Sequence, residues 1–167
     1  MKKISIVGPE SSGKTTVARA LAKLLKETFV KEYAREYLTK NKQYSIKDLK
    51  IISERQSKNI NNANLKVKKY LITDTSIIDI RIWSEMKYNK CHNSIKTKAI
   101  EENFDLYLLC KPDLPWFEDP LRENPHDRKK LFNAFKLALK EKKAKYIILE
   151  GNLITRLLSA LNSINKL

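Results

Sequence analysis

The sequence near the N-terminus contains Gly8-Pro9-Glu10-Ser11-Ser12-Gly13-Lys14-Thr15, which fits the pattern G-x-x-x-x-G-K-[ST]. Glycine allows backbone conformations that a Cβ penalises, so the chain can wrap closely round a group of oxygen atoms. Successive backbone N–H groups then form a nest for an anion, and the following helix adds the positive end of its dipole. The chain has 3 glycines, and two of them occupy the two glycine positions of this pattern. The pattern therefore predicts a phosphate-binding loop that takes a nucleoside triphosphate.

The positions of this loop have separate expected tasks. Lys14 would reach the β- and γ-phosphates, and the Thr15 hydroxyl would hold Mg²⁺. A guanine-specific switch would need Asn-Lys-x-Asp after a later strand, where this chain has Cys-Lys-Pro-Asp at 110–113. The predicted cofactors are therefore ATP and Mg²⁺. The residues expected to contact the nucleotide are Gly8, Glu10, Ser11, Ser12, Gly13, Lys14, Thr15 and Thr16.

Strand and helix patterns alternate outward from the loop. Apolar runs predict strands at 4–7, 29–30, 70–73, 104–109 and 146–149. Amphipathic spacing and capping signals predict helices from Thr15 to about Lys26, from Ser45, after Asp74, from Asn124-Pro125 and over the last residues. This order predicts an α/β P-loop NTPase kinase fold, with a five-stranded, mostly parallel sheet and helices on both faces. The length suits a single domain, 1–167, with one core.

The composition narrows the class of protein and its partners. No apolar run approaches the ~20 residues of a membrane-spanning helix, and no targeting segment is visible. We therefore expect a cytoplasmic protein without a membrane partner. The net charge of +15 comes from lysines spread along the whole chain, which favours general attraction of anions over specific nucleic-acid recognition. The isolated cysteines do not indicate a disulfide or a zinc site, and the sequence leaves a homo-oligomer open.

Two further segments bring charge to the expected phosphate site. Asp74 ends the third strand, where it could orient Mg²⁺ through water, accept the proton of the attacking hydroxyl, or merely cap the next helix. Asp79, further along that helix, is expected in solvent or facing a ribose. The segment 115–128 is rich in proline and charge and predicts a mobile, arginine-bearing lid that excludes water. Arg122 is its first candidate catalytic residue and Arg128 its second, beside Lys14 and Asp74.

The acceptor side is expected after the short second strand, at Glu32-Tyr33-Ala34-Arg35-Glu36. Carboxyl ends of parallel strands meet at one edge of the sheet, where ligands collect. Glu32 could bind ribose hydroxyls or act as the base, and Arg35 could hold a phosphate or pair with Glu36. Trp83 could stack on a flat ring or lie in the core. The candidate acceptor residues are Glu32, Tyr33, Arg35, Asp74 and Trp83.

Four segments together carry a resemblance to a known family. They read, in chain order, GPESSGKTT, EYARE, LITDTSIIDIRIWSE and PWFEDPLRENPHDRKKLF. This series resembles the ribosylnicotinamide kinase domain of bifunctional NadR proteins, within the NadR-like P-loop ATPase/kinase family. The EYARE and PW-x-x-D-x-x-R segments are more particular than the phosphate loop, and the resemblance runs over nearly the whole chain.

The resemblance implies transfer of the ATP γ-phosphate to the 5′-hydroxyl of nicotinamide riboside, giving the mononucleotide in NAD salvage. It implies phosphate and magnesium roles for Lys14 and Thr15 and the lid role for Arg122. Adenylyl transfer and transcriptional control are not expected, because the sequence begins at the first strand of the kinase. The alternatives are a regulatory or nucleic-acid-associated P-loop ATPase, and a kinase of another nucleoside or nucleotide.

Overall fold

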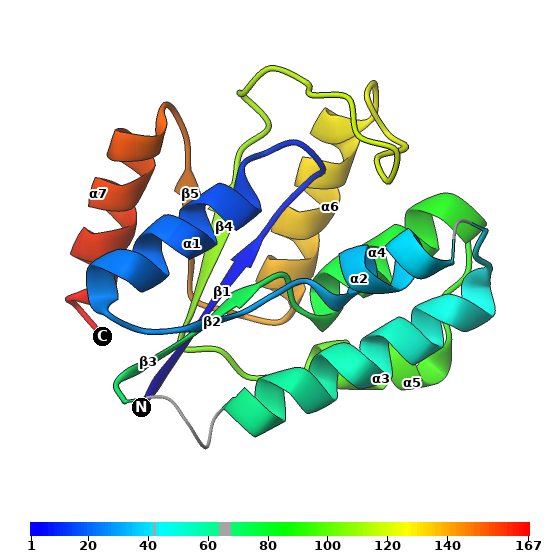
Figure 1. The fold of residues 1–167 in the computed structure, drawn as a ribbon, viewed down its shortest axis with the longest axis horizontal. Coiled ribbons are helices and arrows are strands. Elements are labelled where there is room, and N and C mark those ends of the chain that lie inside the picture. The colour runs from blue at the N-terminus through cyan, green and yellow to red at the C-terminus, as the bar shows by residue number, and fades with distance from the viewer. Residues whose placement is uncertain (42, 64–67) are drawn as a thin grey trace.

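Five parallel strands form one sheet in the order β2-β3-β1-β4-β5 (Figure 1). This computed structural model describes residues 1–41, 43–63 and 68–167. The strands are β1 (Lys2–Val7), β2 (Phe29–Val30), β3 (Tyr70–Asp74), β4 (Leu106–Cys110) and β5 (Tyr146–Leu149). The sheet confirms the predicted five strands and their parallel pairing.

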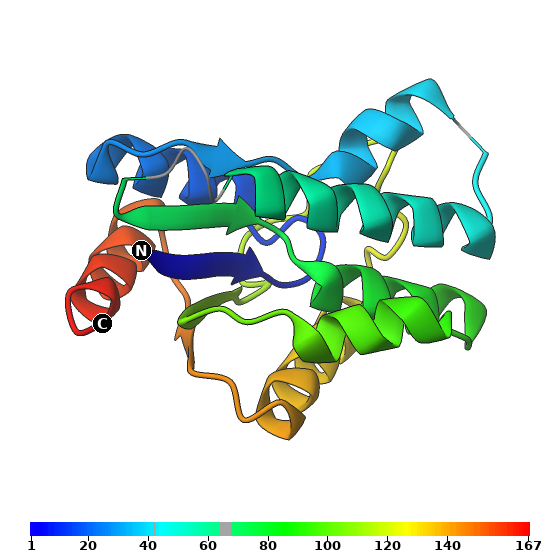
Figure 2. The same ribbon diagram turned by 90° about the horizontal axis from the view of Figure 1, so that it is seen from below.

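Helices cover both faces of the sheet (Figures 1 and 2). One face packs against α1 (Lys14–Leu25) and α7 (Leu153–Ile164), and the other against α2 (Tyr33–Lys40), α3 (Ile46–Ala63), α4 (Ile77–Tyr88), α5 (Asn93–Glu101) and α6 (Arg128–Glu141). Side chains of β4 alternate between these two layers, as the period of a strand requires: Leu106 and Leu108 face α1 and α7, while Tyr107 and Leu109 face the other layer. Among the described residues, no helix is long and apolar enough to cross a bilayer.

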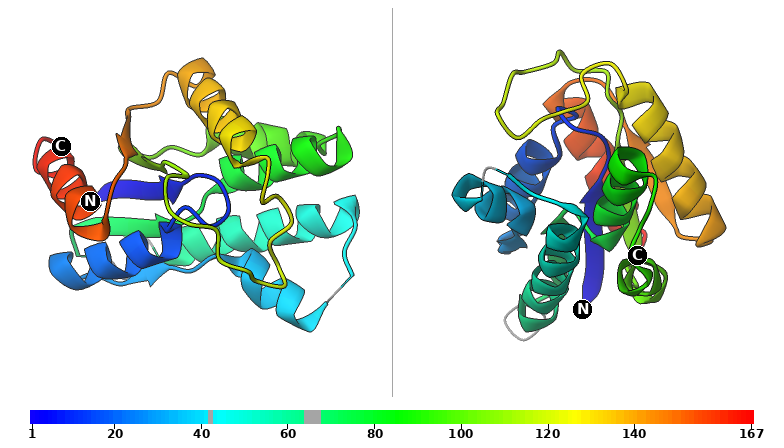
Figure 3. Two further views of the ribbon diagram at one scale, coloured as in Figure 1. Left: turned by 90° about the horizontal axis from the view of Figure 1, so that it is seen from above. Right: turned by 90° about the vertical axis from the view of Figure 1, so that its right-hand side faces the viewer.

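The carboxyl ends of the central strands meet at one edge of the sheet. Ile6 of β1 pairs with Asp74 of β3, and Val7 pairs with Leu109 of β4. The phosphate loop that follows Val7 therefore lies between the end of β3 and the end of β4. Figure 3 shows the long connection between β4 and α6 arching over this loop. The topology thus gathers the loop, Asp74 and the predicted lid at a single edge.

Several boundaries differ from those that the sequence predicts. Short helices α2 and α5 were not predicted, because each buries only two side chains on its apolar face. Strand β4 begins at Leu106, two residues after the predicted start at Phe104, whose ring packs beside Tyr107 with centroids 5.3 Å apart. Helix α6 begins at Arg128 and not at Asn124-Pro125. Asn124 cannot cap that helix, because its backbone and side chain bind the phosphate loop instead.

Candidate active site

The phosphate loop wraps tightly because two glycines adopt conformations that other residues rarely reach. Gly8 has φ +140° and Gly13 has φ +85°. A Cβ on Gly8 would lie 2.7 Å from the carbonyl oxygen of Cys110, so glycine lets β1 and β4 approach each other at the loop. The N–H of Val17 donates to the carbonyl of Gly13 over 3.0 Å and starts α1 directly after the loop. The loop therefore has the tight turn and the helix N-terminus that bind phosphates.

Lys14, Thr15 and Asp74 lie together at this loop, as predicted. Lys14 Nζ donates to the carbonyls of Gly8 over 2.7 Å and Pro9 over 2.9 Å. Thr15 Oγ1 donates to Asp74 Oδ2 over 2.6 Å. Asp74 is 2% exposed, and within the described part of the chain its Oδ1 has no hydrogen-bond partner. Burial raises the pKa of Asp74, against the Thr15 hydrogen bond and nearby Lys14, which lower it.

These oxygens fit Mg²⁺. A hydroxyl and a carboxylate with a free acceptor oxygen are ligands that Mg²⁺ takes alongside water and substrate phosphates. Magnesium needs no cage of protein side chains, and among the described residues no group of three or more His, Cys, Asp or Glu could hold a metal. Asp74 does not cap α4, because Ser76 is the N-cap of that helix. The capping alternative for Asp74 is therefore wrong.

The carboxylate of Asp79 is held by hydrogen bonds and is not simply solvated. Its carboxylate completes the capping box of α4 by accepting from the Ser76 N–H over 2.9 Å and the Ser76 hydroxyl over 3.3 Å. Its other oxygen accepts from the Gly8 N–H over 3.4 Å. Burial raises the pKa of Asp79 to about 7, although Lys14 opposes this shift. Asp79 thus joins the first turn of α4 to the phosphate loop.

Arg156, which no sequence motif singles out, binds the phosphate loop from α7. This side chain of α7 is 1% exposed, and its guanidinium donates to the carbonyl of Ser12 in the loop. It also donates to the carbonyls of Gly151 over 2.9 Å and Lys111 over 3.0 Å, and it pairs with Asp113. A lone arginine in an apolar helix was the only available signal. Its bonds join the loop to the ends of β4 and β5.

The predicted lid segment, 115–128, lies on the phosphate loop. Ser11 Oγ accepts from the Phe117 N–H over 3.1 Å. Arg122 Nη1 donates to the Phe117 carbonyl over 2.6 Å and approaches Ser11 Oγ at 3.4 Å. Arg128 Nη1 donates to the carbonyls of Leu114 over 2.9 Å and Ser11 over 3.3 Å. Both candidate arginines of the lid segment therefore contact Ser11 of the phosphate loop.

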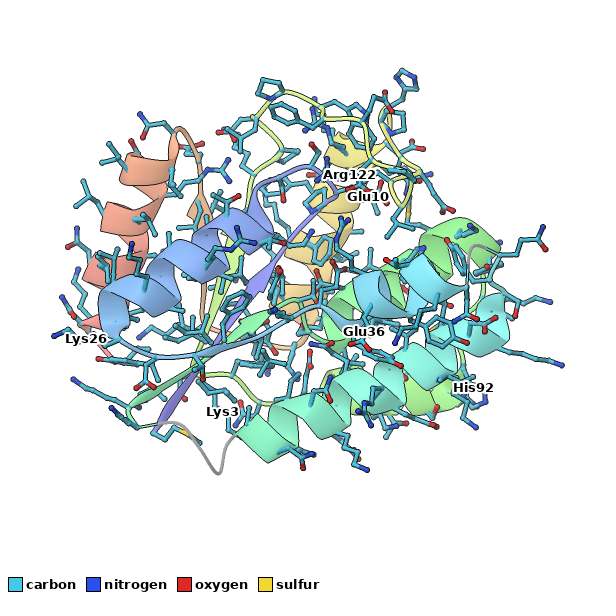
Figure 4. The ribbon with its side chains drawn as sticks, in the orientation of Figure 1. Lys3, Glu10, Lys26, Glu36, His92 and Arg122 are labelled. Carbon is cyan, nitrogen blue, oxygen red and sulfur yellow. The ribbon has the colours of Figure 1, made fainter. Side chains whose placement is uncertain are left out.

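The side chain of Glu10 joins the phosphate loop to the lid segment by hydrogen bonds. Its carboxylate accepts from the backbone N–H of Asn124 over 2.8 Å and of Glu123 over 3.1 Å, and from the Asn124 amide over 3.3 Å. Figure 4 shows Glu10 and Arg122 next to each other where the two segments meet. The sequence pattern assigns Glu10 to the nucleotide, whereas its carboxylate in the structure binds the lid segment.

A cavity of about 200 Å³ opens beside the loop, under the lid segment. Three of the predicted acceptor residues, Glu32, Arg35 and Trp83, line it together. Asp74 is not part of its lining, and neither is Tyr33, which packs against Tyr37 with ring centroids 6.1 Å apart. The lining also includes Gln56 and Asp79 and an apolar wall made by Leu38, Ile52, Ile80, Met86, Leu131 and Phe135.

The three predicted acceptor residues have distinct environments. Glu32 is the N-cap residue of α2, and burial raises its pKa, against the opposing charge of Lys14. Arg35 pairs with Asp119 of the lid segment over 2.9 Å and not with Glu36. Trp83 is partly buried, and its Nε1 donates to the Tyr44 hydroxyl over 3.2 Å. Trp83 therefore has one polar atom fixed while its ring remains part of the cavity wall.

Gln56 is a cavity residue that the sequence reading missed. It lies on α3, in the sequence between segments that carry recognisable motifs, and its side chain is 1% exposed. Its Oε1 accepts from the Tyr33 N–H over 2.8 Å, at the start of α2. A polar residue inside the apolar face of an amphipathic helix was the available signal.

Comparison with known proteins gives the same fold and family. The profile of the AAA domain family AAA_28 matches residues 3–156. The trifunctional NAD biosynthesis/regulator protein NadR of Escherichia coli K12 is 27% identical over 159 residues, covering 90% of this chain and 38% of that protein. NadR of Salmonella typhimurium is 28% identical over 156 residues, covering 88% of this chain and 38% of that protein. The chain therefore spans about two fifths of the length of these curated relatives.

Solved structures agree on the architecture. A crystal structure of a NadR protein in complex with NR has a TM-score of 0.85 and 23% identity, covering 99% of this chain and 51% of that one. Deoxyadenosine kinase from M. mycoides, solved with the products dCMP and dCDP, has a TM-score of 0.70 and 16% identity, covering 99% and 100%. These likenesses confirm the predicted P-loop kinase fold.

Proposed function

This chain belongs to the AAA domain family AAA_28, and from that premise we propose that it is an ATP-dependent kinase whose acceptor is nicotinamide riboside. The observation that carries the proposal is the cavity beside the phosphate loop, because a half-buried carboxylate, Glu32, lines it together with Lys14. A kinase needs this adjacency of phosphate donor and hydroxyl acceptor, whereas a switch or a simple ATPase does not. The NadR relatives support the choice of acceptor.

On the donor side, the loop residues 8–16 hold the triphosphate in this proposal. Lys14 turns from the loop carbonyls that it contacts to the β- and γ-phosphates, which are stronger acceptors for an ammonium group. Thr15 and Asp74 hold Mg²⁺, which when bound neutralises charge on the phosphate oxygens. Arg122, with Arg128 behind it, adds positive charge to the transferred group and excludes water as part of the lid.

On the acceptor side, Glu32 is the general base in this proposal and Asp74 is not. Asp74 is bound by Thr15 and stands outside the cavity lining, whereas Glu32 belongs to that lining. Burial raises the pKa of Glu32, which brings a carboxylate closer to the range where a general base works well. Glu32 would take the proton of the acceptor's 5′-hydroxyl while the hydroxyl oxygen attacks the γ-phosphorus of ATP and ADP leaves.

The choice of nicotinamide riboside rests on the rest of the cavity and on the relatives. In this proposal Trp83, which lines the cavity, stacks its indole ring on the heterocycle of the acceptor. A NadR protein has been solved in complex with NR, and it shares the fold of this chain with a TM-score of 0.85. Arg35, which could have gripped an acceptor phosphate, already pairs with Asp119. This pairing favours a nucleoside acceptor over a nucleotide.

A nucleoside panel tests the proposal. The purified protein is given ATP and Mg²⁺ with nicotinamide riboside, adenosine, deoxyadenosine, cytidine, thymidine or thymidylate, and ADP release is followed by a coupled assay. We expect the highest kcat/KM for nicotinamide riboside and no gain for the phosphorylated acceptor. A higher kcat/KM for another nucleoside would overturn the acceptor assignment, and release of ADP independent of every acceptor would overturn the kinase.

A further inference from the structure

The amide nitrogen of Gln56 is a buried donor without a partner beside the acceptor cavity. The side chain is 1% exposed, and within the described residues its Nε2 makes no hydrogen bond. Leaving a buried donor unsatisfied costs free energy, because the group has lost its hydrogen bonds to water. Buried polar groups without partners are uncommon, so each one calls for a physical reason. A ligand that completes the hydrogen bond is one such reason at a cavity wall.

The orientation of this amide follows from its neighbours. The Tyr33 backbone N–H can only donate, and it lies 2.8 Å from the Gln56 oxygen. Turning the amide over would set the NH₂ group against that N–H, donor against donor. The oxygen is therefore fixed on Tyr33 and the NH₂ group is directed elsewhere. Gln56 lines the same cavity as Glu32 and Trp83.

Two other buried polar atoms of the described residues share this lack of a partner, and they help to interpret Gln56. One is Asp74 Oδ1, at the candidate magnesium position, and the other is the hydroxyl of Tyr107, which is not part of the cavity lining. At Asp74 the unpartnered atom belongs to a carboxylate that is suited to binding Mg²⁺. Gln56 has an unpartnered donor, Nε2, whereas Asp74 has an unpartnered acceptor, Oδ1.

We propose that Gln56 determines acceptor specificity by donating its Nε2–H to a carbonyl oxygen on the heterocycle of the acceptor. This inference rests on the proposed function and names the chemical feature that the cavity reads. A site that hydrogen-bonds a substrate group discriminates strongly against analogues that lack it, because its own buried group is then left unpaired. The carboxamide oxygen of a nicotinamide ring has the required chemistry.

Gln56 also has a structural task, which the test must separate from recognition. Its oxygen satisfies one of the free N–H groups at the N-terminus of α2, next to the N-cap residue Glu32. Removing the amide could therefore shift Glu32 and slow every acceptor alike. Recognition of a carbonyl, in contrast, affects only acceptors that carry one.

The experiment crosses one substitution with one change in the acceptor. Wild type and Gln56→Met are compared on nicotinamide riboside and on the riboside of 3-methylpyridine, in which a methyl group replaces the carboxamide. For wild type we expect kcat/KM to be about 10- to 100-fold higher with the carboxamide. For Gln56→Met we expect this ratio to fall close to 1, while the KM for ATP stays the same. Gln43→Met, the same change at an exposed position, is the control and should keep the wild-type ratio.

Each outcome bears on the inference. An equal loss for both acceptors in Gln56→Met would show that Gln56 only positions α2 and would overturn the proposal. If Gln56→Met does not fold, the wild-type ratio of kcat/KM between the two ribosides still tests the proposal. A ratio near 1 contradicts recognition of the carbonyl. If wild type phosphorylates no nucleoside, the proposed kinase fails, and calorimetric binding of the two ribosides then tests Gln56 separately. Equal affinity for both would overturn its role.

Discussion

The phosphate loop and the acceptor cavity adjoin each other, yet the chain builds them in different ways. The loop is eight consecutive residues whose function lies mainly in backbone N–H groups and two glycines. The cavity takes its polar side chains from α2, α3 and α4 and its cover from the lid segment. A local motif can thus specify phosphate binding, whereas recognition of an acceptor depends on side chains that only the tertiary fold brings together.

Lys14→Ala should break the donor side alone and have the largest effect. Removing the ammonium that stabilises the transferred charge should lower kcat at least about 1000-fold. Among the described residues, Lys14 Nζ donates to two loop carbonyls, so the thermal midpoint should hardly change. Steady-state kinetics, thermal unfolding and calorimetric binding of the acceptor provide the measurements. Activity within tenfold of wild type would contradict the donor assignment.

Glu32→Gln should break the acceptor side and leave the donor side intact. Loss of the base should lower kcat about 100- to 1000-fold, with unchanged affinity for Mg-ATP. In wild type, kcat should fall as the pH drops through the Glu32 pKa, which burial raises above its usual value. This acid limb should disappear in the variant.

The control is Glu36→Gln, on the same helix. Glu36 is not part of the cavity lining, and it pairs with Lys40 at the exposed surface. The Glu36→Gln variant should keep the kcat of wild type and the same fall of kcat at low pH. An acid limb that survives in Glu32→Gln would assign the base to another carboxylate, with Asp74 and Asp79 as the nearest candidates.

Arg122→Ala tests how the phosphate loop and the acceptor cavity are connected, because the lid segment contacts both. Arg122 binds Ser11 of the loop and lines the acceptor cavity. We expect kcat to fall about 10- to 100-fold, since the arginine acts on charge that develops during transfer. The KM for ATP should change less than kcat. A variant with raised KM and unchanged kcat would make Arg122 a residue of ground-state binding only.

Glu102→Gln should give the smallest effect and concerns only stability. Glu102 accepts from the N–H groups of Ile77 and Ile78 at the start of α4, and burial raises its pKa to about 7. The folded protein therefore keeps this proton to higher pH than the unfolded chain, so the contribution to stability is present at low pH and is lost as the pH rises through 7.

Chemical unfolding of Glu102→Gln and wild type at pH 5 and pH 8 measures this contribution. The variant should lose about 1–2 kcal/mol more, relative to wild type, at pH 5 than at pH 8. The difference between the two proteins cancels the other titrating groups. A pH-independent difference would mean that Glu102 titrates near its ordinary value.

The sheet and the position of the loop could be predicted from the sequence because their signals are local. The motif at 8–15 and the apolar runs of the strands need no knowledge of distant contacts. The position of Asp74 beside the loop could be predicted, because the carboxyl ends of neighbouring parallel strands lie at the same edge of the sheet. The short helices α2 and α5 were missed, since two buried side chains each make too weak a periodic pattern.

The residues that sequence reasoning missed act through partners far away in the chain. Gln56 binds the backbone of Tyr33, and Arg156 binds the carbonyl of Ser12. Glu10 was assigned to the nucleotide because it stands in the loop, but its carboxylate binds Asn124, 114 residues away. Pairings of this kind are fixed by tertiary packing, and one sequence does not encode them in any local pattern.

Following the labelled γ-phosphate determines whether the protein transfers it to the 5′-hydroxyl of the acceptor. The protein is incubated with Mg²⁺, γ-labelled ATP and either nicotinamide riboside or its 5′-deoxy analogue, and the products are identified by mass spectrometry. We expect labelled nicotinamide mononucleotide and ADP in equal amounts, with no labelled product from the 5′-deoxy analogue. Label appearing only as inorganic phosphate, at the same rate with and without the riboside, would contradict this expectation.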